Sequence, residues 1–265
     1  MPIKHRLADM TFVEFGERIA ENPVILIPLG SQEEQGTTAP LGDFMLSQAL
    51  ADEAAQKSGA IVAPTIPFGY GDNFRTVPGG IQLRAETLRR LLRDVCDNFL
   101  SHGLTRLLIV NGHTGNDPLI LETIRLIRRE KQIAIPSINI WRLMKPEIWT
   151  AAFGEAGAKT SGHGAQPLSA VYAHYFPLLM RPDLAEPPRN KKKFLGFPTA
   201  GMSAVKAGPT EVTMPLFVTD ITDNGVVSGD PSATSAEAGK IIAEHIVTSL
   251  VDFIKEWAKA DPRVG

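Results

Sequence analysis

Two carboxylates and one imidazole lie in polar loops of this sequence and could together bind a metal ion. Glu33 and Asp43 belong to the segment GSQEEQGTTAPLGD (residues 30–43), and His113 belongs to NGHTGN (residues 111–116). Carboxylate oxygens and imidazole nitrogens suit divalent cations such as Zn²⁺ and Mn²⁺. Three protein ligands leave a position for water, whose pKa a bound cation lowers toward ~7. These residue types therefore predict a hydrolytic metal centre.

Each of these side chains also has a purely structural interpretation. Asp43 could cap the N-terminus of a helix, because Asp is a preferred capping residue. Glu33 and Glu34 could be exposed loop charges, and His113 could be hydrogen-bonded in a tight Asn-Gly turn. The spacing alone does not decide between these interpretations and a metal site.

His163 is a second candidate for chemistry. It lies between two glycines in TSGHGAQP, and glycine permits close approach of the backbone to a ligand. Imidazole titrates near neutral pH and is a common general acid or base. The alternative is an ordinary loop histidine. Cys96, by contrast, lies in a helical pattern, where we do not expect a nucleophile.

Apolar runs and amphipathic segments alternate along the chain and must position these loops. Apolar runs typical of strands cover residues 24–30, 61–66, 107–110 and 133–141. Helical spacing begins near Asp43, Ala85 and Asn116, and a long helix is predicted from Thr234 to Ala260. The alternation predicts an α/β fold with a mainly parallel sheet covered by helices on both faces. In such folds the reactive loops follow the carboxyl ends of the strands.

One stretch does not follow this alternation. Residues 181–210 hold five prolines and the basic run Lys191–Lys193, which predicts a long irregular excursion of the same domain. The basic run is interpreted as a solvated surface, with a phosphate or subunit contact as the alternative.

Composition restricts the classes of function. The chain has 265 residues, 43% of them hydrophobic, and a formal net charge of −2, which argues against a nucleic-acid or anionic-membrane surface. Its single cysteine excludes an intrachain disulfide and a multi-cysteine metal site. No secretory signal and no apolar stretch of the ~18–20 residues of a membrane helix are found. We therefore expect a cytoplasmic protein.

Taken together, several segments resemble the creatininase family of metal-dependent amidohydrolases. GSQEEQGTTAPLGD resembles the family pattern GS-x-E-Q-H-G…P-x-G…D, and NGHTGN resembles NGH-x-x-N. HGAQPLSA (residues 163–170) resembles HAGE-x-ET-S, and GVVSGDPSATSAEAGK (residues 225–240) resembles G-V-x-GDP-x-x-A-x-x-x-x-G. The glycine-rich residues 67–80 are similar to the family's G-x-S…PGT stretch. The segments occur in the family's order.

The resemblance implies a three-layer α/β/α sandwich formed by one domain, residues 1–265, and a cyclic or linear amide substrate. It also implies two divalent metals bridged by an Asp. By motif position, Glu33, the bridging Asp43 and His113 match the ligands of one metal. His163 matches the histidine that transfers a proton. A homo-oligomer, often a hexamer, is implied as well.

The positions of the second metal depart from the family pattern. Gln35 stands where the family has His, and the family's remaining carboxylate ligand falls at Gly115 or Leu168. Gln166 also replaces a family Glu. A neutral amide binds a divalent cation far more weakly than imidazole or carboxylate, and Leu cannot bind it. We therefore expect one zinc or manganese site per chain and the loss of most of the second site.

The resulting prediction is metal-dependent hydrolysis of a non-peptide C–N bond in a cyclic amide or formamide. In this reaction His163 would pass a proton to the leaving nitrogen. We expect substrate contacts in the segments that carry the resemblance, at Gln35, Tyr70, Gly79, Gly80 and Gln166. Two alternatives stay open: a ligand-binding or regulatory protein that has lost catalysis, and a mononuclear metal lyase or isomerase.

Overall fold

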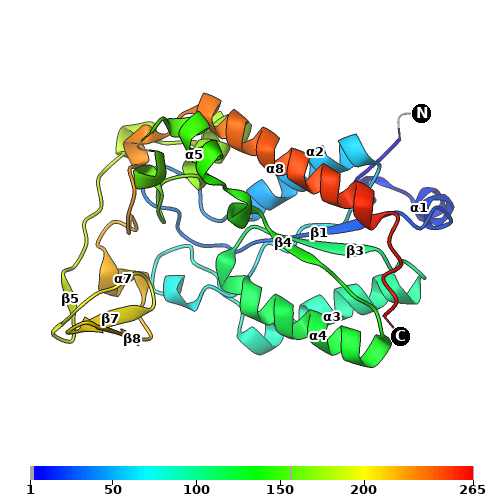
Figure 1. Ribbon diagram of the computed structural model, residues 1–265, viewed down its shortest axis with the longest axis horizontal. Coiled ribbons are helices and arrows are strands. Elements are labelled where there is room, and N and C mark those ends of the chain that lie inside the picture. The colour runs from blue at the N-terminus through cyan, green and yellow to red at the C-terminus, as the bar shows by residue number, and fades with distance from the viewer. Residues whose placement is uncertain (1–2, 156, 265) are drawn as a thin grey trace.

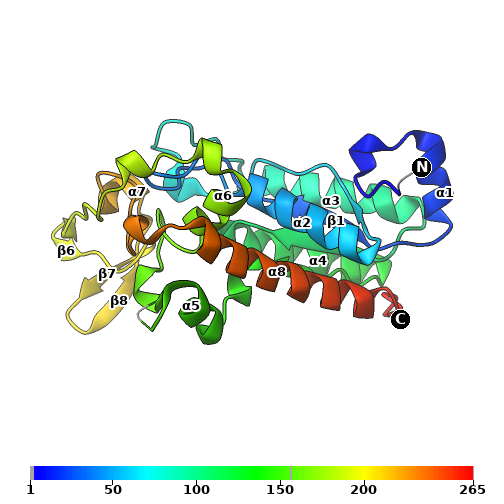
Figure 2. The same ribbon diagram turned by 90° about the horizontal axis from the view of Figure 1, so that it is seen from above.

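A four-stranded parallel sheet forms the centre of the protein (Figures 1 and 2), as seen in a computed structural model that describes residues 3–155 and 157–264. Its strands are β1 (Ile25–Leu29), β2 (Ile61–Val62), β3 (Leu107–Asn111) and β4 (Ser137–Asn139). They lie in the order β2-β1-β3-β4, and each neighbouring pair is parallel. The predicted parallel sheet is confirmed.

The two outer strands are shorter than the apolar runs that predicted them. In the run 61–66 the ladder stops after Val62, and Ile66 returns only as an isolated bridge to Leu29. In the run 133–141 the strand covers three residues. Each run contains a proline, Pro64 or Pro136, which has no N–H to donate to a ladder. Proline therefore limits both edges of the sheet.

Helices cover both faces of the sheet, which makes three layers (Figure 1). One face carries α2 (Phe44–Ser58) and α8 (Ala236–Trp257), and the other carries α3 (Ala85–Ser101) and α4 (Asp117–Lys131). The shorter helices α5 (Pro146–Phe153) and α6 (Leu168–Tyr175) pack against α8, and α1 (Phe12–Ile19) lies at the end of the molecule where the chain begins. The starts predicted near Asp43, Ala85, Asn116 and Thr234 are confirmed within about two residues.

The central strands are apolar throughout because both of their faces are buried. Successive side chains alternate between the two layers, as the pleat requires. Leu26, Leu108 and Val110 pack with α2 and α8 in one core. Ile25, Ile27, Leu107 and Ile109 pack with α3 and α4 in the other. Every residue of β1 and β3 is buried, so the polar loops that follow them start from fixed points.

An arm projects from the carboxyl-end side of the sheet, left in Figure 1. It comprises residues 186–223 and contains β5 (Lys193–Phe194), β6 (Phe197–Pro198), β7 (Ala204–Ala207), β8 (Thr210–Thr213) and α7 (Val218–Ile221). The prediction that the stretch 181–210 is irregular is wrong for these paired segments. Strands of two to four residues, mostly exposed, leave no hydrophobic alternation to detect.

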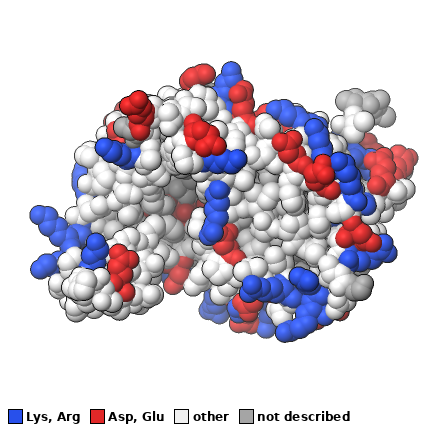
Figure 3. Space-filling view, viewed as in Figure 1, with Lys and Arg blue, Asp and Glu red and all other residues white. Residues whose placement is uncertain are grey.

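The surface carries mixed charge. Figure 3 shows basic and acidic side chains interspersed over one face of the molecule, in line with the net charge of −2. Among the described residues, no helix combines the length and apolar character needed to span a bilayer.

Close packing of α6 on α8 depends on Gly239. A methyl group at this position would lie 1.9 Å from the carbonyl oxygen of Ala170. We expect Gly239→Ala to lower the free energy of unfolding by ~1–3 kcal/mol through overpacking. At Gly16 of α1 a methyl would meet nothing within 4 Å. Gly16→Ala should therefore raise stability by ~0.5–1 kcal/mol, because alanine has the better helix propensity. Urea unfolding of both variants measures this, and equal effects would contradict the packing.

Candidate active site

A cavity opens where the chain leaves the carboxyl ends of β1 and β3. Its volume is about 500 Å³. The loop after β1 supplies Glu33 and Asp43, the turn after β3 supplies His113, and residues 161–168 close one side. Met202 contributes from the arm, and its backbone oxygen accepts a hydrogen bond from Asn73. The position is the one expected for reactive loops of a parallel sheet.

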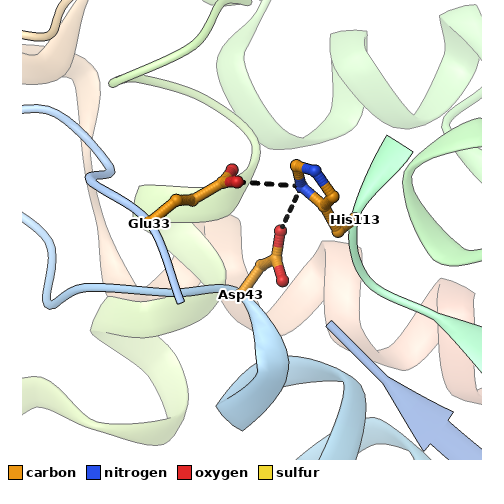
Figure 4. A group of neighbouring side chains, drawn as sticks. All are labelled: Glu33, Asp43 and His113. Atoms are coloured by element: carbon orange, nitrogen blue, oxygen red, sulfur yellow. Dashed lines mark hydrogen bonds and ion pairs between the residues drawn. The ribbon is translucent and has the colours of Figure 1, made fainter. Parts of the chain in front are cut away.

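The three predicted metal ligands converge in this cavity (Figure 4). Nδ1 of His113 lies 3.1 Å from Oε2 of Glu33 and 3.1 Å from Oδ2 of Asp43. One possible ligand atom of each of the three side chains lies within 4.8 Å of a possible ligand atom of the other two. All three side chains are buried, with exposed fractions of 2% for Glu33, 2% for Asp43 and 6% for His113.

Hydrogen bonds aim the two carboxylates at this point. Ser31 donates from its hydroxyl to Oε2 of Glu33 (2.6 Å) and from its backbone N–H to Oδ1 of Asp43 (2.7 Å). The amide of Gln35 donates to Oε1 of Glu33 (3.0 Å). Asp43 is the N-cap residue of α2 by position, but its side chain makes no capping bond and is turned to Ser31 and His113. The interpretation of Glu33 and Glu34 as exposed charges is wrong, because they are 2% and 4% exposed.

The ring of His113 is fixed through its other nitrogen. Nε2 lies 3.1 Å from the backbone oxygen of Tyr70, an acceptor, so Nε2 carries a proton and Nδ1 offers its lone pair in the neutral ring. Asn111 holds the turn by bonding both the N–H (3.1 Å) and the C=O (2.7 Å) of His113. A methyl at Gly115 would lie 2.4 Å from Nε2, so this contact requires glycine. The sequence did not identify these supporting roles.

Burial and the charges of the neighbouring groups together shift the pKa of all three side chains. Burial alone would lower the pKa of His113, but the charges of Glu33 and Asp43 outweigh it and raise that pKa well above its ordinary value. Burial raises the pKa of Asp43 to about 6, against the opposing effect of His113. For Glu33, burial is outweighed by the charge of His113, and its pKa is lowered. Without a metal, His113 therefore supplies the positive charge.

This donor set fits a divalent cation. Two carboxylate oxygens and one imidazole nitrogen are the ligands of many zinc and manganese sites. A backbone carbonyl that holds the far nitrogen of the histidine is the usual supporting interaction of such a ligand. A cation at this point would replace the proton that His113 otherwise carries.

His163 lies across the same cavity and is paired with a carboxylate. Its Nε2 is 2.6 Å from Oε1 of Glu34. Its ring stacks on Phe74, with centroids 4.6 Å apart and planes 30° from parallel. Burial would lower the pKa of His163, but the hydrogen bond and charge of Glu34 outweigh it and raise that pKa. The sequence singled out His163 but left Glu34 as a candidate surface charge and gave no signal for Phe74.

Comparison with known proteins agrees with this architecture. The family described as creatinine amidohydrolase matches residues 8–254. The chain belongs to the creatinine amidohydrolase family. Members of this family are metal-dependent hydrolases of amide bonds, and so is this chain. The resemblance inferred from the motifs is confirmed.

Individual relatives cover nearly the whole chain. Creatinine amidohydrolase of Pseudomonas putida is 26% identical over 276 residues, 94% of this chain and 96% of the relative. The mycofactocin precursor peptide peptidase of Mycobacterium ulcerans (strain Agy99) is 27% identical over 249 residues, 89% of this chain and 86% of the relative. A solved structure called creatininase Mn has a TM-score of 0.81 at 23% identity, covering 97% of this chain and 100% of that one. The last likeness supports the fold.

The positions that depart from the creatininase pattern have other roles here. Gln35 donates a hydrogen bond to Glu33 and so supports one of the three candidate metal ligands. Gly115 makes room for the bond between His113 and Tyr70. Leu168 begins α6 and lines the cavity with an apolar side chain. Within residues 3–155 and 157–264, the triad is the one cluster of three or more His, Cys, Asp or Glu side chains spaced for a metal.

The structure separates the expected substrate-binding residues into two groups. Gln35 and Gln166 line the cavity, whereas Tyr70, Gly79 and Gly80 do not. The amide of Gln166 is bonded within the protein, to Oγ1 of Thr234 (2.7 Å) and to the N–H of Ala170 (3.1 Å). Tyr70 contributes its backbone oxygen to His113. Contact of all five with a substrate stays a prediction.

The raised pKa values predict how the stability of metal-free protein depends on pH. A folded-state pKa above the unfolded value stabilises the fold fully below ~6.5, and the stabilisation is lost as pH rises through the folded pKa. His113 and His163 both act in this direction. The free energy of unfolding should fall as the pH rises above ~6.5 toward the folded-state pKa values, by up to ~1.4 kcal/mol per pH unit for each group.

Urea unfolding of chelator-treated protein at several pH values measures this slope. The window lies above the pKa of about 6 for Asp43, so both triad carboxylates stay ionised. The variant His102→Asn, which changes an exposed histidine, is the control and should keep the slope. A stability that is flat or rises across the window would contradict the charged form of His113.

Proposed function

We propose that this chain hydrolyses a non-peptide C–N amide bond of a small molecule, of the cyclic amide or formamide type. The proposal rests on one observation. The buried side chains of Glu33, Asp43 and His113 line a cavity that is also lined by His163. The proposal assigns one creatininase-like domain, residues 1–265, a cytoplasmic location and a homo-oligomeric state. It includes no nucleic-acid or membrane partner.

One zinc or manganese ion per chain is the proposed cofactor. Glu33 and Asp43 would hold it through carboxylate oxygens, and His113 through Nδ1. When bound, such an ion lowers the pKa of water toward ~7 and polarises a carbonyl oxygen. The protein's part is to keep Nδ1 free for the ion, through Tyr70, and to aim both carboxylates, through Ser31.

His163 would supply the proton that the leaving nitrogen needs. An amide nitrogen is a poor leaving group until it is protonated, and a metal ion cannot donate that proton. His163 lines the cavity, and the hydrogen bond and charge of Glu34 raise its pKa, which favours the protonated ring. General acid catalysis of this kind contributes roughly 10²–10⁴-fold.

The lining of the cavity favours a small, mostly uncharged substrate. About 500 Å³ is within the usual range for small-molecule sites. The described residues that line it include two histidines and the triad carboxylates but no Lys or Arg side chain. Flat apolar contact is offered by Phe74 and Trp141. A ligand that needs a cationic side chain to pair with its carboxylate would find none among these lining residues.

A substrate panel tests the proposal. Protein loaded with Zn²⁺ or Mn²⁺ is incubated with creatinine, a formamide, a linear amide and a short peptide, because one relative is a peptide peptidase. Turnover of creatinine or the formamide supports the proposal. Turnover of the peptide alone would contradict the proposal that the hydrolysed bond is a non-peptide amide. Binding of a panel compound without turnover would favour the ligand-binding alternative, which the neutral residues Gln35 and Gly115 motivate.

Metal analysis should find one tightly held cation per chain. Gln35, Gly115 and Leu168 offer no strong ligand for a second. His113→Ala should lose the cation and the activity. The fold should survive at reduced stability, because the ring lies in a loop but also provides the counter-charge of the buried Glu33 and Asp43, so circular dichroism must show that the assayed variant is folded. His102→Ala, at an exposed site, is the matched control and should keep the cation and the activity. Two tightly bound ions per chain, or an active His113→Ala, would show that the assigned site is wrong.

Replacing His163 should separate proton transfer from metal binding. His163→Asn should keep one cation per chain and lower kcat by roughly 10²–10⁴-fold, as expected for loss of a general acid. Metal content and kcat are measured on the same preparation. Loss of metal together with rate would identify His163 as a ligand, and an unchanged kcat would remove it from the mechanism.

A further inference from the structure

We propose that Glu34 is a positioning residue that holds Nε2 of His163 and thereby assigns proton transfer to the other ring nitrogen, Nδ1. The inference rests on the proposed function, in which His163 protonates the leaving nitrogen. It adds a residue that no part of the metal site requires.

The contact between the two side chains is short and shielded from water. Oε1 of Glu34 lies 2.6 Å from Nε2 of His163. Glu34 is 4% exposed, and the side chain of His163 is 14% exposed. An ionised carboxylate can only accept a hydrogen bond, so the proton between them belongs to Nε2. Low exposure makes such a charge-assisted bond stronger than it would be at the surface.

Glu34 is itself held in place. Its Oε2 accepts a hydrogen bond of 2.7 Å from the backbone N–H of Gly36. On another side, a methyl added to Gly225 would lie 2.3 Å from the same oxygen, so backbone packs directly on the carboxylate. Both oxygens are therefore engaged, and the group has little room to swing toward the metal site.

His163 is restrained on further sides. Phe74 covers one face of the ring, and the backbone oxygen of His163 accepts a hydrogen bond of 3.0 Å from Val227. A half-turn of the ring about its axis would place a carbon in the position of Nε2 and lose the bond to Glu34. The observed orientation is thus the one that keeps the carboxylate satisfied.

The remaining nitrogen is the one free to exchange a proton. Across the part of the chain that the structure describes, no hydrogen bond to Nδ1 of His163 is found. In the hydrolysis, the oxygen of water adds to the carbonyl carbon and the C–N bond breaks. The bonding pair stays on nitrogen, which takes the proton from Nδ1. A proton from the attacking water returns to Nδ1, so one amide and one water are consumed and Nε2–H stays with Glu34.

The neighbouring carboxylate has a different task. Glu33 accepts hydrogen bonds from Ser31 and Gln35 and lies 3.1 Å from Nδ1 of His113, and among the described residues no hydrogen bond joins it to His163. The family pattern GS-x-E-Q-H-G has Gln at the step that Glu34 occupies, so this carboxylate is not part of the shared metal motif. Its role must follow from what it contacts in this chain.

Kinetics of Glu34→Gln test the inference. This change keeps size and removes charge. With Zn²⁺-loaded protein and an amide that the parent hydrolyses, kcat should fall roughly 10–100-fold, as for other supporting residues. KM and metal content should stay within about twofold. The control Asp52→Asn alters a carboxylate of equal burial, 4% exposed and paired with Arg6, and should leave kcat unchanged.

A double variant decides whether Glu34 acts through His163. If it does, Glu34→Gln combined with His163→Asn should be no slower than His163→Asn alone. Multiplying losses would overturn the inference, as would an unchanged kcat of Glu34→Gln. Loss of metal in Glu34→Gln would also overturn it and make Glu34 a ligand.

Nuclear magnetic resonance supplies a readout that needs no substrate. In the Zn²⁺-loaded parent, Nε2 of His163 should carry a slowly exchanging, downfield proton, which Glu34→Ala loses and Asp52→Asn keeps. An Nε2 without a proton in the parent would overturn the inference. If no amide in the panel is hydrolysed, the proposed function fails, and this measurement still decides whether Glu34 orients His163.

Discussion

Two buried carboxylates that face one another must share a positive charge, and the arrangement of the site follows from this requirement. Glu33 and Asp43 are 2% exposed each, and like charges so placed cannot both stay ionised without a counter-ion. Nδ1 of His113 lies 3.1 Å from each of them and meets this need in the metal-free chain. The same three side chains could hold a divalent cation, so one cluster would balance the two carboxylates either with a proton or with a metal.

The layers of the fold were predictable from sequence because both faces of the sheet are buried. A fully apolar run such as residues 107–110 is typical of a central parallel strand, and the position of His113 follows from its end. What sequence could not predict depends on distant contacts. In the sequence Glu34 resembles an exposed loop charge, because Gly225, whose backbone packs against its carboxylate, lies almost two hundred residues later in the chain. The arm was missed because its short strands carry no periodic signal.

The departures from the family pattern form a consistent set. Where the pattern has a histidine, Gln35 donates to Glu33, and a metal ligand becomes a support for the neighbouring ligand. Gly115 lies so close to Nε2 of His113 that a larger side chain would disturb the bond to Tyr70. A carboxylate could not be restored at position 115 without moving that ring. Among the described residues, one group of three side chains is spaced for a metal, and a side chain at position 115 would disturb it.

Adjacent residues of one loop serve two histidines. Glu33 lies beside His113, and Glu34 is bonded to His163, so the loop after β1 fixes both ends of the cavity at once. A shift of this loop would move Glu33 and Glu34 together, and with them the contacts of both histidines. Loss of activity in a loop variant is then ambiguous, whereas metal content and the proton on Nε2 of His163 can be measured separately. The physical division of labour between two neighbouring carboxylates is what makes these two properties separable in this protein.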